Sequence, residues 1–467
     1  CPVLTEVPEE SNDSIQDSFS LSDGLSSCEE FGNVMGKTPA SAGPSPEPQF
    51  NVVTYPGNSP LIRAVAQGED KNAAWRKDME DASVLISDYG GKKGTSFFGV
   101  FDGFHGRSSA ELAARELPVL LLEQLVKADP SFSLASEQRD FLSRMETLFE
   151  RDSPVSVDQG TMTKEQQMTQ AFTIAFAHMD RILGLGRNET SKLRWSGCAS
   201  VICMVEEEEV TPEEVVTPEE EDPKTLHGRM HIANCGNIHA VLYKQGKSFN
   251  VTKDHSTANS EERKRILKEG GAISINKNHG LVEGLLLATR GFGNYGDRKL
   301  RKVVLPTPSC VSLGLDPSSG LLVLGSRGLW DGVQPEEIAH VVRRCIRNCQ
   351  RCHSHTKATK EQLRDLCSFT LQEPAENQEA AIEKPPCRGG MEDQEPSASY
   401  RQPKDPTNRE DAGRAAVEDV NYEQLAASIC SKLLQRAMAS GSRENISVMV
   451  ILLQGLEVLG VQSEDGV

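Results

Sequence analysis

The sequence contains few aromatic and few hydrophobic residues for its length. Of its 467 residues, 5% are aromatic and 37% are hydrophobic, whereas a compact globular chain is roughly 45–50% apolar when Gly is included. Part of the chain is therefore expected to lie outside any core. No stretch approaches the roughly 20 consecutive apolar residues of a membrane span, and residues 1–30 contain no apolar region typical of a signal peptide. We therefore expect no membrane partner.

The chain also has less positive than negative charge. Its 50 Lys and Arg stand against 68 Asp and Glu, which gives a formal net charge of −18. A general nucleic-acid binder needs a basic face, so no nucleic-acid partner is expected. The 12 cysteines are scattered and accompany no secretory signal, which predicts free thiols and a cytoplasmic or nuclear location. No heptad pattern predicts a coiled coil, and a monomer is expected.

Several segments are too polar to contribute to a core. The first of them is rich in Ser, Pro, Gly and acids and has Lys37 as its single basic residue, a composition typical of disorder. Two internal stretches are similar, one with four consecutive Glu and two Val-Thr-Pro-Glu-Glu repeats, the other rich in Glu, Gln and Pro. The predicted organisation is a disordered acidic tail over 1–55, one domain over 56–455 with disordered insertions at about 206–225 and 352–418, and a C-terminal tail over 456–467.

The rest of the chain alternates between strand and helix patterns. Short β-branched or aromatic runs bounded by turn residues predict strands over 84–87, 97–102, 198–205, 230–236, 239–244, 321–326 and 446–453. Apolar residues at helical spacing predict helices over 108–127, 164–183, 260–268, 335–347 and 422–439. The strands come in groups, and two of them follow each other as a hairpin, which favours antiparallel sheets and an α+β fold.

The sharpest local motif is Phe-Phe-Gly-Val-Phe-Asp-Gly-Phe-His-Gly at 97–106. It places Asp102 and Gly103 at the tip of a strand, where a carboxylate and a backbone carbonyl could hold a hard cation. A hairpin with the preceding strand would bring Glu80 close to Asp102. An Asp-Gly pair alone, however, is most often only a turn.

Further motifs follow in order, and together they resemble the metal-dependent Ser/Thr protein phosphatases of type 2C. They are Arg-x-x-Met-Glu-Asp (76–81), the strand and its Asp-Gly (97–103), Ser-Gly-Cys-Ala-Ser (196–200), Ala-Asn-Cys-Gly-Asn (233–237), Thr-Lys-Asp-His-Ser (252–256), Glu-Gly-Gly-Ala-Ile (269–273), Ala-Thr-Arg-Gly-Phe-Gly-Asn (288–294), Ser-Arg-Gly-Leu-Trp-Asp (326–331) and Glu-Asn-Ile-Ser-Val (444–448). The resemblance implies two packed antiparallel β-sheets flanked by helices, an α-β-β-α sandwich.

The resemblance also implies a chemistry. In that family two ions, Mn²⁺ or Mg²⁺, hold a water molecule and lower its pKa, and the resulting hydroxide attacks the phosphorus of phosphoserine or phosphothreonine. By motif position, Arg76 matches the phosphate-binding arginine. The metal positions match Glu80, Asp102, the Gly103 carbonyl, the outer Asp331 and Glu444.

The chain departs from the family pattern at several of these positions. Phe104 stands where the family has a general-acid histidine, and His105 follows one place later, where strand alternation predicts that it points elsewhere. Asn237 and Asn294 each replace an aspartate. Glu444 replaces the aspartate of the last motif, which keeps the charge but adds a methylene group.

Arg327 is the departure with the largest predicted effect, because it replaces a metal-ligand aspartate. The family's inner carboxylates sum to −4, whereas Glu80, Asp102, Arg327 and Glu444 sum to −2. A guanidinium about 4 Å from a divalent ion would be repelled by roughly 8 kcal/mol at an effective dielectric constant of 20, and arginine does not deprotonate. The sequence therefore predicts that Arg327 pairs with Asp102 or Glu444 in place of a metal.

These departures lead to the hypothesis of a pseudophosphatase that binds a phosphoprotein or another protein partner and needs no metal cofactor. Two alternatives stay open: an active Ser/Thr phosphatase, or residual activity with one Mn or Mg ion at a weakened site of Glu80, Asp102 and Gly103. A separate scaffold role for the acidic tail and insertions is a further possibility.

A second constellation lies at 345–355, where Cys345, Cys349, Cys352 and His355 have the ligand types of a zinc site. The simpler interpretation is the end of an amphipathic helix that carries free thiols and a basic face of Arg343, Arg344, Arg347 and Arg351.

Overall fold

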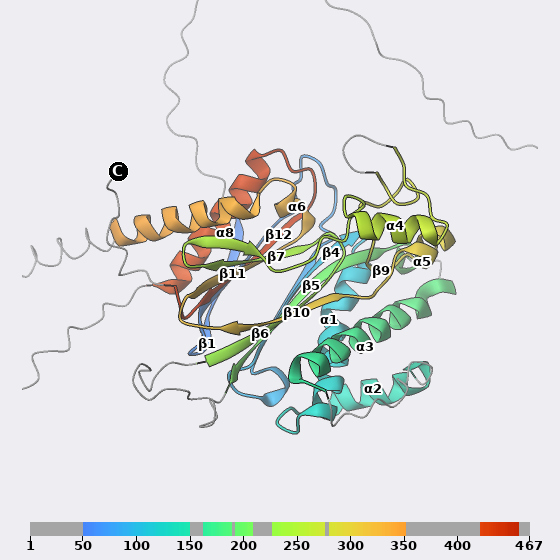
Figure 1. The fold of residues 1–467 in the computed structure, drawn as a ribbon, viewed down its shortest axis with the longest axis horizontal. Helices are drawn as coiled ribbons and strands as arrows, with labels where there is room; N and C mark the ends of the chain where they lie inside the picture. Colours follow the sequence, from blue (N-terminus) through green and yellow to red (C-terminus); the bar gives the residue numbers. More distant parts are fainter. Residues whose placement is uncertain are drawn as a thin grey trace, which may run out of the picture. The chain divides into compact units, whose positions relative to one another are not determined.

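Two antiparallel sheets lie against each other at the centre of the fold (Figure 1). The computed structural model describes residues 50–149, 162–188, 192–208, 227–275, 280–351 and 421–456. The first sheet has the order β1 (Asn51–Ser59), β2 (Ile62–Asp70), β12 (Ile446–Leu453), β11 (Ser319–Gly325), β7 (His239–Lys244) and β8 (Lys247–Asn250). The second has the order β10 (Ser309–Leu315), β6 (His227–Cys235), β5 (Gly197–Glu208), β4 (Ser96–Phe104) and β3 (Ala82–Ser87), and β9 (Phe292–Gly293) pairs with β5.

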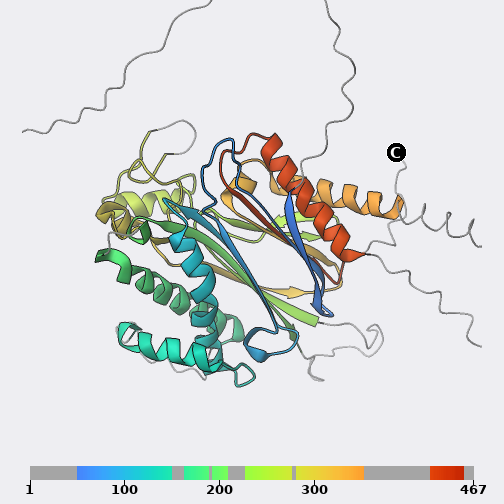
Figure 2. The ribbon, with the colours of Figure 1, turned by 180° about the vertical axis from the view of Figure 1, so that it is seen from behind.

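Helices cover the outer face of each sheet, as Figure 2 shows from behind. The second sheet is covered by α1 (Ser108–Ala128) and α3 (Lys164–Leu185), with α2 (Ser136–Phe149) packed on α3. The first sheet is covered by α8 (Tyr422–Ala439) and a helix over 335–351. Shorter helices are α4 (Ser260–Lys268), α5 (Arg298–Val303) and α6 (Arg327–Trp330). The predicted α+β sandwich is confirmed.

Apolar side chains from both sheets fill the space between them. Phe98 and Val201 of the second sheet belong to the same buried cluster as Leu322 and Met449 of the first. Because helices cover the outer faces as well, the central strands are buried on both sides, and every residue of β12 is buried. This explains why 446–453 is an unbroken apolar run rather than an alternating one.

The structure differs from the sequence prediction at several borders. Strand β1 begins at Asn51, so the border placed between 55 and 56 falls inside a strand; its Pro56 is tolerated because β1 is an edge strand. The strands β1, β2, β8, β9 and β10 and the helices α2, α5 and α6 were not predicted, because they are short or mix small and polar residues. The predicted tail up to residue 49, the insertion at 352–418 and residues 457–467 lie outside the described residues.

The acidic insertion begins later than its composition suggested. Strand β5 continues to Glu208, and residues 209–225 lie outside the described residues. Glu206 is buried because Lys164 lies 2.8 Å and Lys92 3.2 Å from its carboxylate, and His231 lies 3.2 Å away. Cations from neighbouring elements therefore neutralise the start of the glutamate run. No helix in the described ranges is both long and apolar enough to cross a membrane.

Candidate functional site

A cavity of about 280 Å³ collects most of the residues that the motifs single out. Its polar lining comes from the loop before β3, the end of β4, the turn before β7, the start of α6 and the loop before β12. One wall is apolar and consists of Leu281, Leu285, Leu286, Leu287 and Ala288. The lining includes Arg76, Glu80, Asp102, Gly103, Phe104, His105, Asn237, Arg327 and Glu444.

Glu80 reaches the cavity through close backbone packing. Strand β3 pairs with β4, and Ala82 lies opposite Phe101, which confirms the predicted hairpin. The Glu80 backbone N–H donates to Asn445 Oδ1 at 2.9 Å. A Cβ on Gly103 would lie 2.1 Å from the Glu80 carbonyl oxygen, so glycine is what lets β4 approach this loop. The hairpin thus brings Glu80 and the end of β4 to the same cavity.

Arg327 lies among the carboxylates. Its backbone N–H, at the start of α6, donates to Asp102 Oδ2 at 2.7 Å. Its guanidinium contacts Glu444 through Nη2, and its Nη1 lies 3.5 Å from Asp331 Oδ2. The side chain is only 20% exposed. The guanidinium therefore pairs with Glu444, one of the two partners predicted, while Asp102 is held by the main chain of the same residue.

Arg76 takes the other oxygen of Glu444. Its Nη2 contacts Glu444 Oε2, and its Nε donates to the Arg443 carbonyl oxygen at 3.1 Å. Glu444 thus lies between two guanidinium groups, and each of its oxygens meets one of them. The arginine that matches the phosphate-binding position is 40% exposed and already has a carboxylate partner.

Asp81 and Asp102 lie in a poorly solvated environment near Arg327, whereas the side chain of Asp331 is 42% exposed. Burial raises the pKa of Asp102, and the charge of Arg327 opposes that rise. Burial and the charge of Asp102 raise the pKa of Asp81 well above its usual value. Burial also raises the pKa of Asp331, again opposed by Arg327. In the part of the chain that the structure describes, no group of three or more His, Cys, Asp or Glu could hold a metal ion.

His105 lies at the cavity, contrary to the strand-alternation argument. Strand β4 ends at Phe104, and His105 adopts a left-handed φ of 58°, so the period of two no longer applies to it. Both rings line the cavity, with centroids 5.9 Å apart. His105 is exposed, and Phe104 keeps the position that the family gives to histidine.

The two asparagines that replace aspartates lie in different surroundings. Asn237 lines the cavity, and its Oδ1 is 2.9 Å from Nε2 of His239. Asn294 is buried and is not part of the cavity lining. Its backbone N–H donates to the Ser196 carbonyl oxygen at 3.0 Å, and its φ is 59°. The structure thus brings Asn237 to the site but not Asn294.

Two residues that the motifs did not single out, Asn445 and His255, position the site from outside. Asn445 Nδ2 donates to the carbonyl oxygens of Lys71 at 2.7 Å and Asp78 at 3.1 Å, which joins the loops on either side of Arg76. His255 is buried, and its Nδ1 accepts from the Gly236 N–H at 3.2 Å, next to Asn237. Burial lowers the pKa of His255 to about 3, which keeps Nδ1 free to accept. Asn445 lies inside a recognised motif, but its partners are far away in the sequence.

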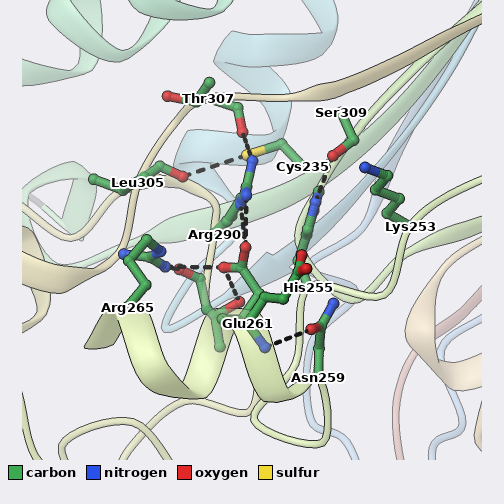
Figure 3. A network of polar contacts seen from close by, with 12 residues as sticks. Cys235, Lys253, His255, Asn259, Glu261, Arg265, Arg290, Leu305, Thr307 and Ser309 are labelled. Atoms are coloured by element: carbon green, nitrogen blue, oxygen red, sulfur yellow. Dashed lines mark hydrogen bonds and ion pairs between the residues drawn. The ribbon is translucent and has the colours of Figure 1, made fainter. Parts of the chain in front are cut away.

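A buried ion network anchors the apolar wall of the cavity. Glu262 of α4 accepts from Arg265 Nη2 at 3.0 Å, Arg290 Nε at 3.0 Å and Thr289 Oγ1 at 2.9 Å. Arg290 also donates to the Thr307 carbonyl oxygen at 3.0 Å. Figure 3 shows the side chain of Arg290 directed at α4, where Arg265 lies on the same helix and His255 lies beside it. Because residues 286–288 of the wall immediately precede Thr289, the network fixes where that wall ends.

The network predicts a pH-dependent stability. Burial alone would raise the pKa of Glu262, but hydrogen bonds from Arg290 and Arg265 lower it from 4.5 to about 2. A depressed pKa stabilises the folded state above pH 4.5, and this contribution is lost as the pH falls towards 2. Glu262→Gln is therefore expected to lower the free energy of unfolding by about 3 kcal/mol at pH 7 and by much less near pH 2.5.

Urea unfolding at the two pH values measures this difference. Glu261→Gln is the matched control, because Glu261 is the exposed neighbour of Glu262 on the same helix turn. A loss of stability for Glu262→Gln that is equal at both pH values would contradict an ionised Glu262 and indicate a packing effect.

The cysteines of the second constellation are only partly described. Cys345 is buried against α8, where Ser428 Oγ lies 3.7 Å from its sulfur, and Cys349 is half-buried. Cys352 and His355 lie outside the described residues. The zinc alternative stays a prediction, whereas the amphipathic helix is present over 335–351.

Comparison with known proteins gives consistent matches. A family model described as Protein phosphatase 2C matches residues 65–371. Protein phosphatase 2C-like domain-containing protein 1 of Homo sapiens is 32% identical over 459 residues, covering 85% of this chain and 73% of that protein. The Mus musculus protein of the same name is 30% identical and covers 86% and 73%. A solved structure titled "Crystal structure of serine-threonine phosphatase 2C from Toxoplasma gondii" aligns over 86% of this chain with 15% identity and a TM-score of 0.48.

Proposed function

The chain belongs to the protein phosphatase 2C family, as its motifs predicted, and we propose that it is a pseudophosphatase within that family. It keeps the fold and the cleft but acts by binding a phosphoprotein or another protein partner rather than by hydrolysis. The observation that carries the proposal is Arg327, whose guanidinium pairs with Glu444 and Asp331 while its N–H holds Asp102. A cation of the protein itself takes the place of a bound metal ion.

The donor set does not fit the two ions that the family implies. Such ions would supply an activated water molecule to attack phosphorus. In this chain both oxygens of Glu444 meet guanidinium groups, and Arg327 would repel any divalent cation placed beside it. The ligand types that remain, Glu80, Asp102 and the Gly103 carbonyl, suit at most one Mn or Mg ion. This supports a site without hydrolytic activity.

Partner binding is supported by what lines the cleft. Arg76 is 40% exposed at the cavity, and arginine recognises phosphate through paired N–H donors. A phosphoryl group would compete with Glu444 for this guanidinium. The leucine wall beside it offers apolar contact to side chains that flank the phosphorylated residue.

A paired measurement with a phosphothreonine peptide tests the proposal. With Mn²⁺ or Mg²⁺ we expect no turnover above that of a protein-free control, while an active family member serves as the positive control. We expect the same peptide to bind, and Arg76→Ala to weaken its binding about tenfold, which corresponds to one charge-assisted hydrogen bond of roughly 1.5 kcal/mol.

Arg436→Ala is the matched control, because Arg436 forms an exposed ion pair with Glu337 outside the cavity lining. Robust Mn²⁺-dependent turnover by the wild type would overturn the proposal and favour an active phosphatase. If the wild type showed neither turnover nor peptide binding, the protein would be inactive as proposed. The proposal that the cleft binds the phosphopeptide would then be wrong.

A further inference from the structure

The helix over 335–351, which follows α6 and is drawn in orange in Figure 1, has two faces of opposite character. One face packs into the core under the first sheet through Ile338, Val342, Cys345 and Ile346, which are all buried. The opposite face is exposed. The first face explains why the helix forms, but it does not explain the composition of the second.

The exposed face carries a row of one histidine and three arginines. His340, Arg344, Arg347 and Arg351 follow each other at steps of four, three and four residues, and all are exposed. At about 100° per residue these steps keep them on one line of the helix. They surround a surface depression of about 390 Å³. We call Arg344, Arg347 and Arg351 the arginine face.

These arginines have no partner of opposite charge in the part of the chain that the structure describes. The other cations of the region are engaged: Arg343 donates to the Gly246 carbonyl oxygen at 2.8 Å, and Arg436 pairs with Glu337. Like charges three or four residues apart destabilise a helix. The helix dipole favours cations only in the last turn, so it does not account for Arg344.

The chemistry of the face narrows the kind of partner. Three guanidinium groups that pair with no carboxylate of the described ranges suit carboxylates, which they bind in pairs of hydrogen bonds. No large exposed hydrophobic residue lies in 335–351, whereas insertion into a membrane surface needs one and single-stranded nucleic acids need stacking aromatic rings. The net charge of −18 also disfavours a nucleic acid.

We propose that the arginine face binds an acidic helical segment of a protein partner. A partner helix with glutamates at steps of three and four residues repeats the spacing of Arg344, Arg347 and Arg351, so each guanidinium meets one carboxylate. This inference uses none of the cavity residues. It goes beyond the proposed function and stands or fails independently of it.

A helical peptide with three glutamates at that spacing is the probe, and a peptide of equal composition with the glutamates spread around the helix is its control. We expect the full-length chain to bind the first peptide more tightly, and raising salt from about 50 to about 500 mM to weaken that binding strongly. We expect the triple variant Arg344→Glu, Arg347→Glu and Arg351→Glu to bind the peptide about tenfold or more weakly. Each exposed ion pair contributes little alone, but the variant removes all three at once.

A second triple variant controls for the change in net charge. Arg107, Arg115 and Lys127 are exposed cations of the α1 region that already pair with Glu111, Glu116 and Glu123. Their replacement by glutamate is expected to leave peptide binding within about twofold, because paired surface charges contribute little. If the arginine-face variant unfolds by circular dichroism, Arg→Gln at the same three positions replaces it.

Several outcomes would overturn the proposal. Equal binding of both peptides would contradict a helical partner, and equal losses in both triple variants would indicate a general charge effect. Tighter binding of phosphatidylserine vesicles or of an RNA oligonucleotide than of the peptide would assign the face to a different class of partner.

Discussion

Replacing Arg327 with aspartate is expected to make folding depend on a divalent cation. In the wild type the guanidinium neutralises Glu444 and lies 3.5 Å from Asp331, while the main chain of the same residue holds Asp102. The variant would place a further carboxylate among these acids and remove the cation between them. Removing one partner of a largely buried ion pair costs about 3–5 kcal/mol. We therefore expect the free energy of unfolding in EDTA to fall by about 3 kcal/mol or more.

Mn²⁺ is then expected to stabilise the variant and to have little effect on the wild type. An ion that binds only the folded state adds about 2.7 kcal/mol at a concentration 100 times its dissociation constant. Urea unfolding of both proteins with EDTA and with Mn²⁺ measures the difference. Arg436→Asp is the control, since its pair with Glu337 is exposed and its loss has a small effect. Equal stabilisation of the wild type by Mn²⁺ would show that Arg327 does not take the place of a metal ion.

The meeting of Glu80, Asp102 and Arg327 was predictable from the sequence. Glu80 and Asp102 come together because β3 pairs with β4. Arg327 follows β11 of the other sheet, and only its place in a recognised motif indicated that it would meet Asp102. The sequence did not show which carboxylate the Arg327 guanidinium would pair with. Arg327 could have paired with either carboxylate, and the start of α6 decides it, because the backbone N–H faces Asp102 and leaves the guanidinium to Glu444.

Residues that act through long-range contacts were invisible in the sequence. His255 and Glu262 look like ordinary polar residues near a helix start, and only the fold shows that both are buried and fully bonded. For Glu206 the sequence led to the opposite mistake, because a buried residue was predicted to be exposed. Its run of glutamates indicates a solvated loop, yet Lys92 and Lys164, distant in sequence, make burial of its carboxylate favourable. Local composition cannot show which cation another element will supply.

Small strands were missed for a related reason. Strand β2 mixes alanines with charged residues, and its buried positions include Ala64 and Ala66, which pack against α8. A helix that approaches a sheet closely needs small residues under it. The pattern therefore has only Ile62 and Val65 as the β-branched residues that identify a strand, although β2 lies between β1 and β12 in its sheet.

Gly103→Ala is expected to be among the most destabilising single substitutions at the site. The added Cβ would lie 2.1 Å from the Glu80 carbonyl oxygen and 2.9 Å from its carbonyl carbon. Both are backbone atoms, held by the pairing of β3 with β4 and by the bond from the Glu80 N–H to Asn445. Neither can rotate away as a side chain would. We expect the free energy of unfolding to fall by about 3 kcal/mol or more.

Gly314→Ala separates this close approach from the general effect of glycine in a strand. Gly314 also lies in a strand of the second sheet, but a Cβ there meets nothing within 4 Å. We expect this variant to change stability by less than about 1 kcal/mol, and in the stabilising direction if the unfolded chain loses entropy. Urea unfolding of both variants measures the contrast. If Gly103→Ala proved as mild as Gly314→Ala, the loop at Glu80 could retreat from β4. Glu80 could then move relative to Asp102. A site in which these carboxylates can move could bind a metal ion beside Arg327.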